Sequence, residues 1–330
     1  IEKQEQIIVY GDYDVDGITG TAILWETLHA LGAKVMPYIP HRIDEGYGLS
    51  TVGIKNLQAE MEDISLIITV DNGIVANAAV EFANEQGIEV IITDHHASGD
   101  EAPKAFAIVH TTNLCGAGVA YLLAKELRSV IPVKTGIHGS PIKSGMTVDE
   151  DNHLELATLG TIADLVPLTA ANRAIVFHGL EKVSRTKRPG LRALFQLARI
   201  TKEDIGTYEI GYMIGPRLNA AGRLESGMDS LRLLCTRDKN RANDLAQKLE
   251  TINRERQVLM KESSEHARLF VDSQPELKKI LIVAHESYQE GVIGLVAGRL
   301  VETFYRPAIV IAKRDKLSKA SVRSIKGFNI

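Results

Sequence analysis

The chain has 330 residues, of which 45% are hydrophobic and 24% charged, and its formal net charge at pH 7 is −4. This composition is ordinary for a globular protein of about two domains, and the charge does not by itself indicate a nucleic-acid binder. No apolar run approaches the roughly 20 residues that span a bilayer, and Cys115 and Cys235 show no zinc or disulfide spacing. We therefore expect a soluble, cytoplasmic protein with no membrane partner.

The first half of the chain alternates β-branched runs with amphipathic segments. Four runs are typical of buried strands, namely residues 7–10, 34–39, 66–70 and 89–93. Segments of helical period begin near Ile18, Leu49, Val75 and Gly116. Strand and helix in alternation predict an α/β fold with a parallel sheet and right-handed crossovers.

The second half predicts a helical region and then a smaller α/β unit. Strand, helix and strand are expected at 279–284, 291–304 and 307–312. Glycine and charge around residues 136–151 indicate an exposed loop. The predicted organisation is a first domain at 1–237, sheet-rich at 1–130 and mainly helical at 153–237, a long connecting helix at 238–271, and a second domain at 272–330.

Three aspartates, Asp12, Asp14 and Asp16, follow the first predicted strand in the stretch "YGDYDVDG". Carboxylates crowded in this way raise one another's pKa or destabilise the segment unless a cation lies among them. A solvated acidic turn is the simpler interpretation of any one of them. Residues elsewhere in the chain distinguish a cation site from a solvated turn.

Other strand ends bring further polar side chains to the same edge of the predicted sheet. Asp71 follows the third strand, and Asp94, His95 and His96 follow the fourth. Open parallel sheets bind ligands beyond the carboxyl ends of their strands, so these side chains are expected to converge. Asp164, in the apolar stretch "LGTIADLVPL", is a further candidate. Each alone is more typical of a cap or a surface residue, but together they predict one site.

The residue types favour a particular kind of metal. A set rich in aspartate with one or two histidines suits Mn²⁺ or Mg²⁺, whereas structural zinc would favour cysteine. Two ions are plausible, with a carboxylate such as Asp71 bridging ions about 3.5–4 Å apart, an arrangement that hydrolyses phosphoesters.

These motifs carry a resemblance to a known family. "DYDVDG", "VDNG", "TDHH" and "LGTIADLVPL" resemble the successive motifs of the DHH phosphoesterase superfamily. "GPRLNAAGRL", "EGVIGLVAGRLVE" and "SVRSIKGFNI" extend the match to the RecJ family of bacterial single-strand-specific 5′→3′ exonucleases. The resemblance covers nearly the whole chain. It implies a DHH domain, a long connecting helix and a smaller DHHA1 domain, with the active site in the cleft between the domains.

The resemblance also implies residue roles. The positions that match the family's metal ligands are Asp14, Asp16, Asp71, His95 and Asp164, with Asp12 as an additional ligand or an outer partner. Asp16, Asp71, His95 and Asp164 would hold one ion, and Asp14 and Asp71 would contribute to the other. His96 is expected to contact the scissile phosphate or to orient a ligand, and Asp94 to support its neighbours.

Two motifs are implied to contact nucleic acid, through Arg217, Asn219 and Arg223 in one and Ser321, Arg323 and Ser324 in the other. Surface charge or structural ion pairs would be the simpler reading of these arginines. Basic stretches at 182–199 and 306–326 would help to steer a strand. The implied activity is two-metal hydrolysis of single-stranded DNA to mononucleotides from the 5′ end, in DNA repair and recombination. Repair proteins and single-strand-binding proteins are the implied protein partners.

The chain departs from the family in three places. Gln289 stands where many relatives have a histidine, the connection around "AIVHTTNLCGAGV" is short, and the sequence stops at Ile330 before the rest of DHHA1 and an OB-fold. We therefore expect a core fragment of a longer protein.

The sequence leaves three alternative functions open. A manganese pyrophosphatase of the same superfamily would need a histidine at the position of Tyr10, which argues against it. A phosphodiesterase of cyclic dinucleotides or short oligonucleotides would share both domains. A non-catalytic single-strand-binding scaffold would have lost metal ligands, whereas this chain has the full set.

Overall fold

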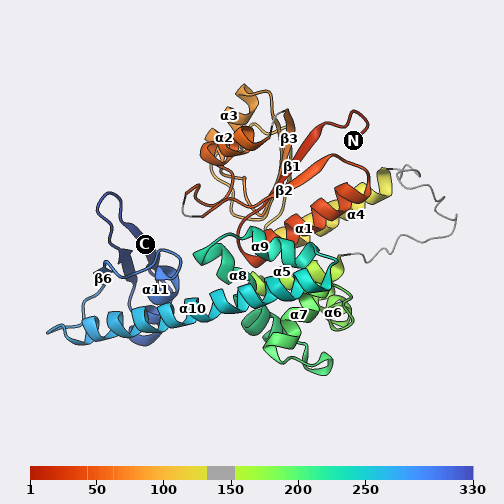
Figure 1. The fold of residues 1–330 in the computed structure, drawn as a ribbon. Helices are drawn as coiled ribbons and strands as arrows, with labels where there is room; N and C mark the ends of the chain where they lie inside the picture. Colours follow the sequence, from red (N-terminus) through yellow and green to blue (C-terminus); the bar gives the residue numbers. More distant parts are fainter. Residues whose placement is uncertain (43, 62, 132–152, 330) are drawn as a thin grey trace. The chain divides into compact units, whose positions relative to one another are not determined.

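The computed structural model describes residues 1–42, 44–61, 63–131 and 153–329 (Figure 1). The chain forms two compact units, Ile1–Leu249 and Glu250–Ile330, and the boundary falls inside the long helix α10 (Lys239–Asp272). The predicted long helix is therefore present, while the domain limits at 237 and 271 stay a prediction. The loop expected at 136–151 lies outside the described residues.

The first unit contains a five-stranded parallel sheet in the order β2-β1-β3-β4-β5. Its strands are β1 (Gln6–Tyr10), β2 (Val35–Tyr38), β3 (Ile64–Val70), β4 (Glu89–Asp94) and β5 (Ala107–His110). The predicted parallel α/β sheet is confirmed, and the four expected strands lie close to their expected bounds. Strand β5 was not expected from the sequence, because this edge strand is only partly buried and lacks a continuous buried apolar run.

Helices cover both faces of this sheet. Figure 1 shows α2 (Thr51–Glu60) and α3 (Asn77–Glu85) on one face, and α1 (Val15–Ala30) and α4 (Gly116–Val130) side by side on the other. Side chains alternate along β1, so Ile8 and Tyr10 pack against Ile54 and Val80 of α2 and α3. Both faces are therefore buried, as expected of a parallel sheet.

Helix α1 is buried along most of its length between the sheet and other helices. It packs against α4, α5 (Leu154–Ala163) and α9 (Met228–Cys235). The close approach requires Gly20, because a Cβ there would lie 2.6 Å from Val70 Cγ1 and 3.2 Å from the Ala117 Cα. Asp14 caps the helix by accepting hydrogen bonds from the backbone N–H groups of Asp16 and Gly17. The acidic loop after β1 is thus held against the core.

The rest of the first unit is helical, as predicted. It contains α5, α6 (Ala170–Ser184), α7 (Pro189–Ala198), the 3₁₀ turn η1 (Lys202–Asp204), the π-helix η2 (Glu209–Ile214), α8 (Gly215–Leu224) and α9. The π-helix was not foreseen, because hydrophobic periodicity does not separate it from an α-helix. It immediately precedes the "GPRLN" motif, and short π-helical turns are frequent at functional sites.

The second unit has a three-stranded sheet in the order β6-β7-β8. Strands β6 (Leu281–His285) and β7 (Ala308–Ala312) are parallel and joined through α11 (Ile293–Phe304), whereas β8 (Lys319–Arg323) is antiparallel to β7. The strand, helix and strand expected here are confirmed. The mostly exposed β8 was not expected, because its sequence is largely polar. In the described ranges, no helix is both long and apolar enough to cross a bilayer.

Two glycine substitutions test this account of packing. We expect Gly20→Ala to destabilise the first unit by about 1–3 kcal/mol or more, because the added methyl group overlaps Val70. Gly298→Ala in α11 meets no atom within 4 Å, so helix propensity should make it neutral or stabilising by up to about 1 kcal/mol. Chemical denaturation followed by circular dichroism measures both. Equal effects of the two substitutions would contradict close packing at Gly20.

Candidate metal centre

The candidate site lies where the strand order of the first sheet reverses. The chain passes from β1 outward to β2 and then returns to β3 on the other side of β1, which makes the β1/β3 edge the switch point of the sheet. The acidic loop follows β1, and Asp71 follows β3 directly. Residues after β4 complete the same edge. The predicted convergence of strand ends therefore has a topological cause.

Asp71 is held in an unusual backbone conformation. Its φ is 63°, in the left-handed region that aspartate tolerates better than most residues. The Asn72 side chain secures this turn by donating to the Val70 carbonyl at 2.8 Å and accepting from the Leu49 N–H at 2.9 Å. A Cβ at Gly116 would lie 2.5 Å from the Asp71 Cβ. The sequence analysis assigned no role to Asn72 or Gly116, although "DNG" and the glycine opening a helix were visible signals.

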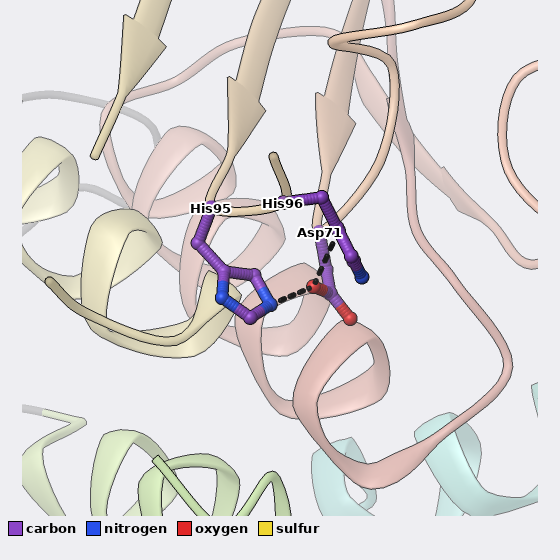
Figure 2. A group of neighbouring side chains, drawn as sticks. All are labelled: Asp71, His95 and His96. Carbon is purple, nitrogen blue, oxygen red and sulfur yellow. Dashed lines mark ion pairs between the residues drawn. The ribbon is translucent and has the colours of Figure 1, made fainter. Parts of the chain in front are cut away.

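Asp71 and His95 form the centre of the cluster. Their Oδ1 and Nε2 atoms lie 3.0 Å apart, and neither of these buried atoms has a hydrogen-bond partner in the described part of the chain. Figure 2 shows the His95 ring directed at the Asp71 carboxylate. A carboxylate oxygen and an imidazole nitrogen are both ligands that a divalent cation such as Mn²⁺ accepts. The pair fits a divalent cation that both atoms would coordinate.

Other carboxylates surround this pair. The Oδ2 atoms of Asp16 and Asp164 each lie 3.7 Å from His95 Nε2. Ligand atoms of Asp12, Asp14 and Asp71 form a second group within 4.8 Å of one another. The structure thus brings together every residue that the sequence analysis named as a metal ligand. Their coordination of an ion stays a prediction.

Asp16 has backbone partners that the sequence did not reveal. Its two carboxylate oxygens accept hydrogen bonds from the N–H groups of Gly116 at 2.6 Å and Ala117 at 2.8 Å, at the start of α4. A helix N-terminus favours negative charge, so α4 stabilises this buried carboxylate. Asp16 is thereby fixed in orientation, and its remaining lone pairs are available to a cation.

Asp94 supports His96 rather than belonging to the cluster. Its Oδ1 accepts from the backbone N–H of His95 and pairs with His96 Nδ1 at 2.8 Å, while Oδ2 accepts from the Ile74 N–H. This agrees with the supporting role expected of Asp94. The hydrogen bond that His96 donates to Asp94 raises the pKa of His96, whose side chain is 56% exposed. His96 is thus both oriented and accessible.

The electrostatics of the cluster favour cations. Burial, reinforced by neighbouring carboxylates, raises the pKa of Asp12 and Asp164 to about 7 and that of Asp16 to about 6. The same causes raise the pKa of Asp71 well above its ordinary value, and burial lowers the pKa of His95. Without a metal the carboxylates bind protons instead. Divalent cations would relieve the repulsion that produces these shifts.

The motif predicted to face nucleic acid packs against the acidic loop. Asn219 Oδ1 accepts a hydrogen bond from the Val15 N–H at 2.8 Å, and Arg217 donates to the Met213 carbonyl at 2.6 Å. A Cβ at Gly222 would lie 2.5 Å from the Tyr13 carbonyl oxygen. Helix α8 therefore positions the loop that carries the aspartates, a structural role that the sequence analysis missed.

The other predicted contacts lie in the second unit, on and just after β8. Arg323 donates to the Val322 carbonyl and Ser324 to the Phe328 carbonyl, while Ser321 and Arg323 adjoin Gly294 at the start of α11. Contact of Arg217, Asn219, Arg223 and these three residues with nucleic acid stays a prediction.

Comparisons with known proteins agree with this fold and site. The family described as "DHH family, N-terminal domain" matches residues 6–161. The single-stranded-DNA-specific exonuclease RecJ of Bacillus subtilis is 39% identical over 341 residues, covering 100% of this chain and 41% of that protein. A manganese-bound RecJ crystal structure matches with a TM-score of 0.82 and 35% identity, over 99% of this chain and 80% of that chain. RecJ of Thermus thermophilus with Mn²⁺ matches with a TM-score of 0.80 and 34% identity, over 99% of this chain and 46% of that one.

The fold and the acidic centre are those of a DHH protein. Within that class, the chain belongs to the RecJ family. It spans 41% to 59% of the length of the curated RecJ relatives that are at least 34% identical to it.

The raised pKa values predict how stability depends on pH and metal. In metal-free protein, Asp12, Asp16 and Asp164 bind protons more tightly when folded than when unfolded, so the free energy of unfolding should fall as pH rises from about 4 to about 7. Millimolar Mn²⁺ should restore several degrees of melting temperature at pH 7.5 and little at pH 5, where protons compete for the ligands. Scanning calorimetry with and without EDTA measures this. Equal stabilisation by Mn²⁺ at both pH values would contradict the prediction.

Proposed function

We propose that this chain carries the catalytic core of a metal-dependent 5′→3′ exonuclease that degrades single-stranded DNA to mononucleotides, in DNA repair and recombination. The observation that carries the proposal is the buried pair Asp71 and His95 inside a group of carboxylates, whose facing atoms have no hydrogen-bond partner among the described residues. Relatives named as single-stranded-DNA-specific exonucleases cover the whole chain at 39% identity. The DHH and DHHA1 domain limits, at 1–237 and 272–330, belong to the same proposal.

The cofactor proposed is Mn²⁺ or Mg²⁺, with two ions. RecJ of Thermus thermophilus has been solved with each of these ions. Asp16, Asp71, His95 and Asp164 would hold one ion, and Asp14 and Asp71, with Asp12, the other. When bound, the ions would supply an activated water and neutralise charge that develops on the phosphate.

The chain's own residues prepare the site for a phosphodiester. Asp94 fixes the His96 ring at 2.8 Å and raises its pKa, so His96 remains protonated to a higher pH than an ordinary histidine. A protonated, exposed imidazole suits a hydrogen bond to a phosphate oxygen. Helix α4 holds Asp16 through two N–H groups, and Asn219 holds the loop through Val15. The site is thus organised by its backbone contacts before substrate arrives.

Contacts to the strand are proposed from both units. Arg217 and Arg223 lie on α8 next to the acidic loop, and Ser321, Arg323 and Ser324 lie at β8. Asn219 adds a positioning role to its proposed contact. We further propose a cytoplasmic location and repair or single-strand-binding proteins as partners.

The environment of Tyr10 argues against the manganese pyrophosphatase activity. Tyr10, which stands where a manganese pyrophosphatase would have histidine, is completely buried in the core between the sheet and helices α2 and α3. Its hydroxyl donates to the Gly48 carbonyl at 3.3 Å. A phosphodiesterase acting on cyclic dinucleotides or short oligonucleotides is distinguished by the assay below.

The direct test uses a long single-stranded DNA labelled at either end, with and without Mn²⁺. We expect labelled mononucleotide to appear early from the 5′-labelled strand, and only when metal is present. Early release from the 3′ label would reverse the proposed polarity. Intact DNA beside rapid cleavage of dinucleotides would instead support the small-substrate phosphodiesterase.

Asp71→Asn tests the centre itself. The amide keeps the size and the tolerance of a left-handed backbone but loses the charge that two ions would share, so turnover should fall at least about a thousandfold. Circular dichroism should remain unchanged. Asp100→Asn is the matched control, because Asp100 is exposed on the loop after β4, and it should retain full activity. Undiminished turnover of Asp71→Asn would remove the two-metal proposal.

A further inference from the structure

The basic stretch at 182–199 forms a feature of the first unit that the metal centre does not use. It runs from the end of α6 through a short loop into α7. Two adjoining cavities share Lys187 of this loop and Pro189, the first residue of α7. We call the cavity of about 650 Å³ beside α7 and α10 the outer pocket, and the cavity of about 520 Å³ beside the end of α1 the inner pocket.

Cations line the outer pocket without opposing carboxylates. Its charged lining residues are Arg185, Lys187, Arg192 and Lys239, and no aspartate or glutamate is among the described residues that line it. Arg185 pairs with Glu181 at 2.9 Å. The other three side chains are exposed and form no ion pair within the described part of the chain. The pocket therefore presents a net positive charge.

The inner pocket contains two carboxylates, but both are already neutralised. Arg188 binds both oxygens of Glu26 at 2.7 Å and binds Glu155 at 2.6 Å. His153 adds a 2.7 Å contact to Glu26. Burial would raise the pKa of Glu26, but these hydrogen bonds outweigh it and lower the pKa to about 2. Glu26 and Glu155 therefore hold Arg188 in place. Lys187 and Arg237 also line this pocket, and neither forms an ion pair with another residue that the structure describes.

Arg128 supplies an unsatisfied donor in the inner pocket. Its Nη1 contacts Thr27 Oγ1 at 3.1 Å and His153 Nδ1 at 3.2 Å, whereas its buried Nη2 has no hydrogen-bond partner among the residues described. A buried guanidinium nitrogen without an acceptor is costly. A phosphate oxygen is one of the strong, charge-assisted acceptors for a guanidinium group.

We propose that the two pockets form a second binding surface for the phosphate backbone of the single strand, separate from the metal centre. Helix α1 begins at the acidic loop and reaches the inner pocket at Glu26, about 15 Å along its axis from Asp16. One strand can therefore occupy both places. Unpaired cations spread over two joined cavities match a row of phosphates better than a single anion. This inference rests on the proposed substrate and adds a site for it.

Binding without cleavage tests the surface directly. Fluorescence anisotropy in EDTA, over a range of salt, would compare a 30-nucleotide single strand with a dinucleotide. Lys187→Ala and Arg192→Ala should each weaken binding of the long strand about tenfold and reduce the slope of log K against log salt by about 0.7. Dinucleotide binding should not change. Lys104→Ala removes an exposed charge that lines neither pocket and serves as the matched control.

The outcomes separate this surface from the proposed activity. Reduced long-strand binding in the two variants, with an unchanged control, supports the surface even if the protein cleaves no DNA. Wild-type affinity and salt slope in both variants would overturn it even if the exonuclease assay succeeds. Loss of dinucleotide binding with intact long-strand binding would assign the pockets to a small nucleotide instead and would also overturn it.

Discussion

The mutual repulsion of buried carboxylates is the constraint on which the site depends. The acidic loop with the start of α1, the end of β3 and the end of α5 place Asp12, Asp16, Asp71 and Asp164 around one site. Burial, reinforced by neighbouring carboxylates, raises the pKa of each. Such an arrangement is unfavourable unless cations or protons occupy it. The protein maintains it through backbone contacts: the N-terminus of α4 stabilises Asp16, and Asn72 fixes the strained turn at Asp71. Folding thus supplies the free energy that keeps the ligands together.

The two basic features of the first unit differ in how their charge is arranged. Arg188 is enclosed by Glu26 and Glu155 and joins α1, α5 and α7 into one structure. Lys187 and Arg192, its neighbours in sequence, carry no partner among the described residues and face solvent. A structural ion pair and exposed, unpaired cations therefore alternate along one short basic stretch, which net charge does not reveal.

Much of the fold and of the cluster was predictable because it depends on short-range patterns. Apolar runs identified β1, β3 and β4, and polar residues after them identified Asp71 and His95. What the sequence concealed depends on contacts between distant segments. The edge strand β5 lacks a strong apolar pattern, Gly116 matters only because Asp71 packs against it, and Asn219 supports Val15 from far along the chain. Such pairings require the folded structure.

Asp14 links the candidate metal centre to the stability of the first turn of α1. Its carboxylate caps α1 through the N–H groups of Asp16 and Gly17, and it belongs to the acidic group that would hold a cation. The first turn of the central helix and the site therefore share one side chain. An ion that immobilises this carboxylate would also slow local opening of the turn, so amide hydrogen exchange at the start of α1 would report metal occupancy from within the core.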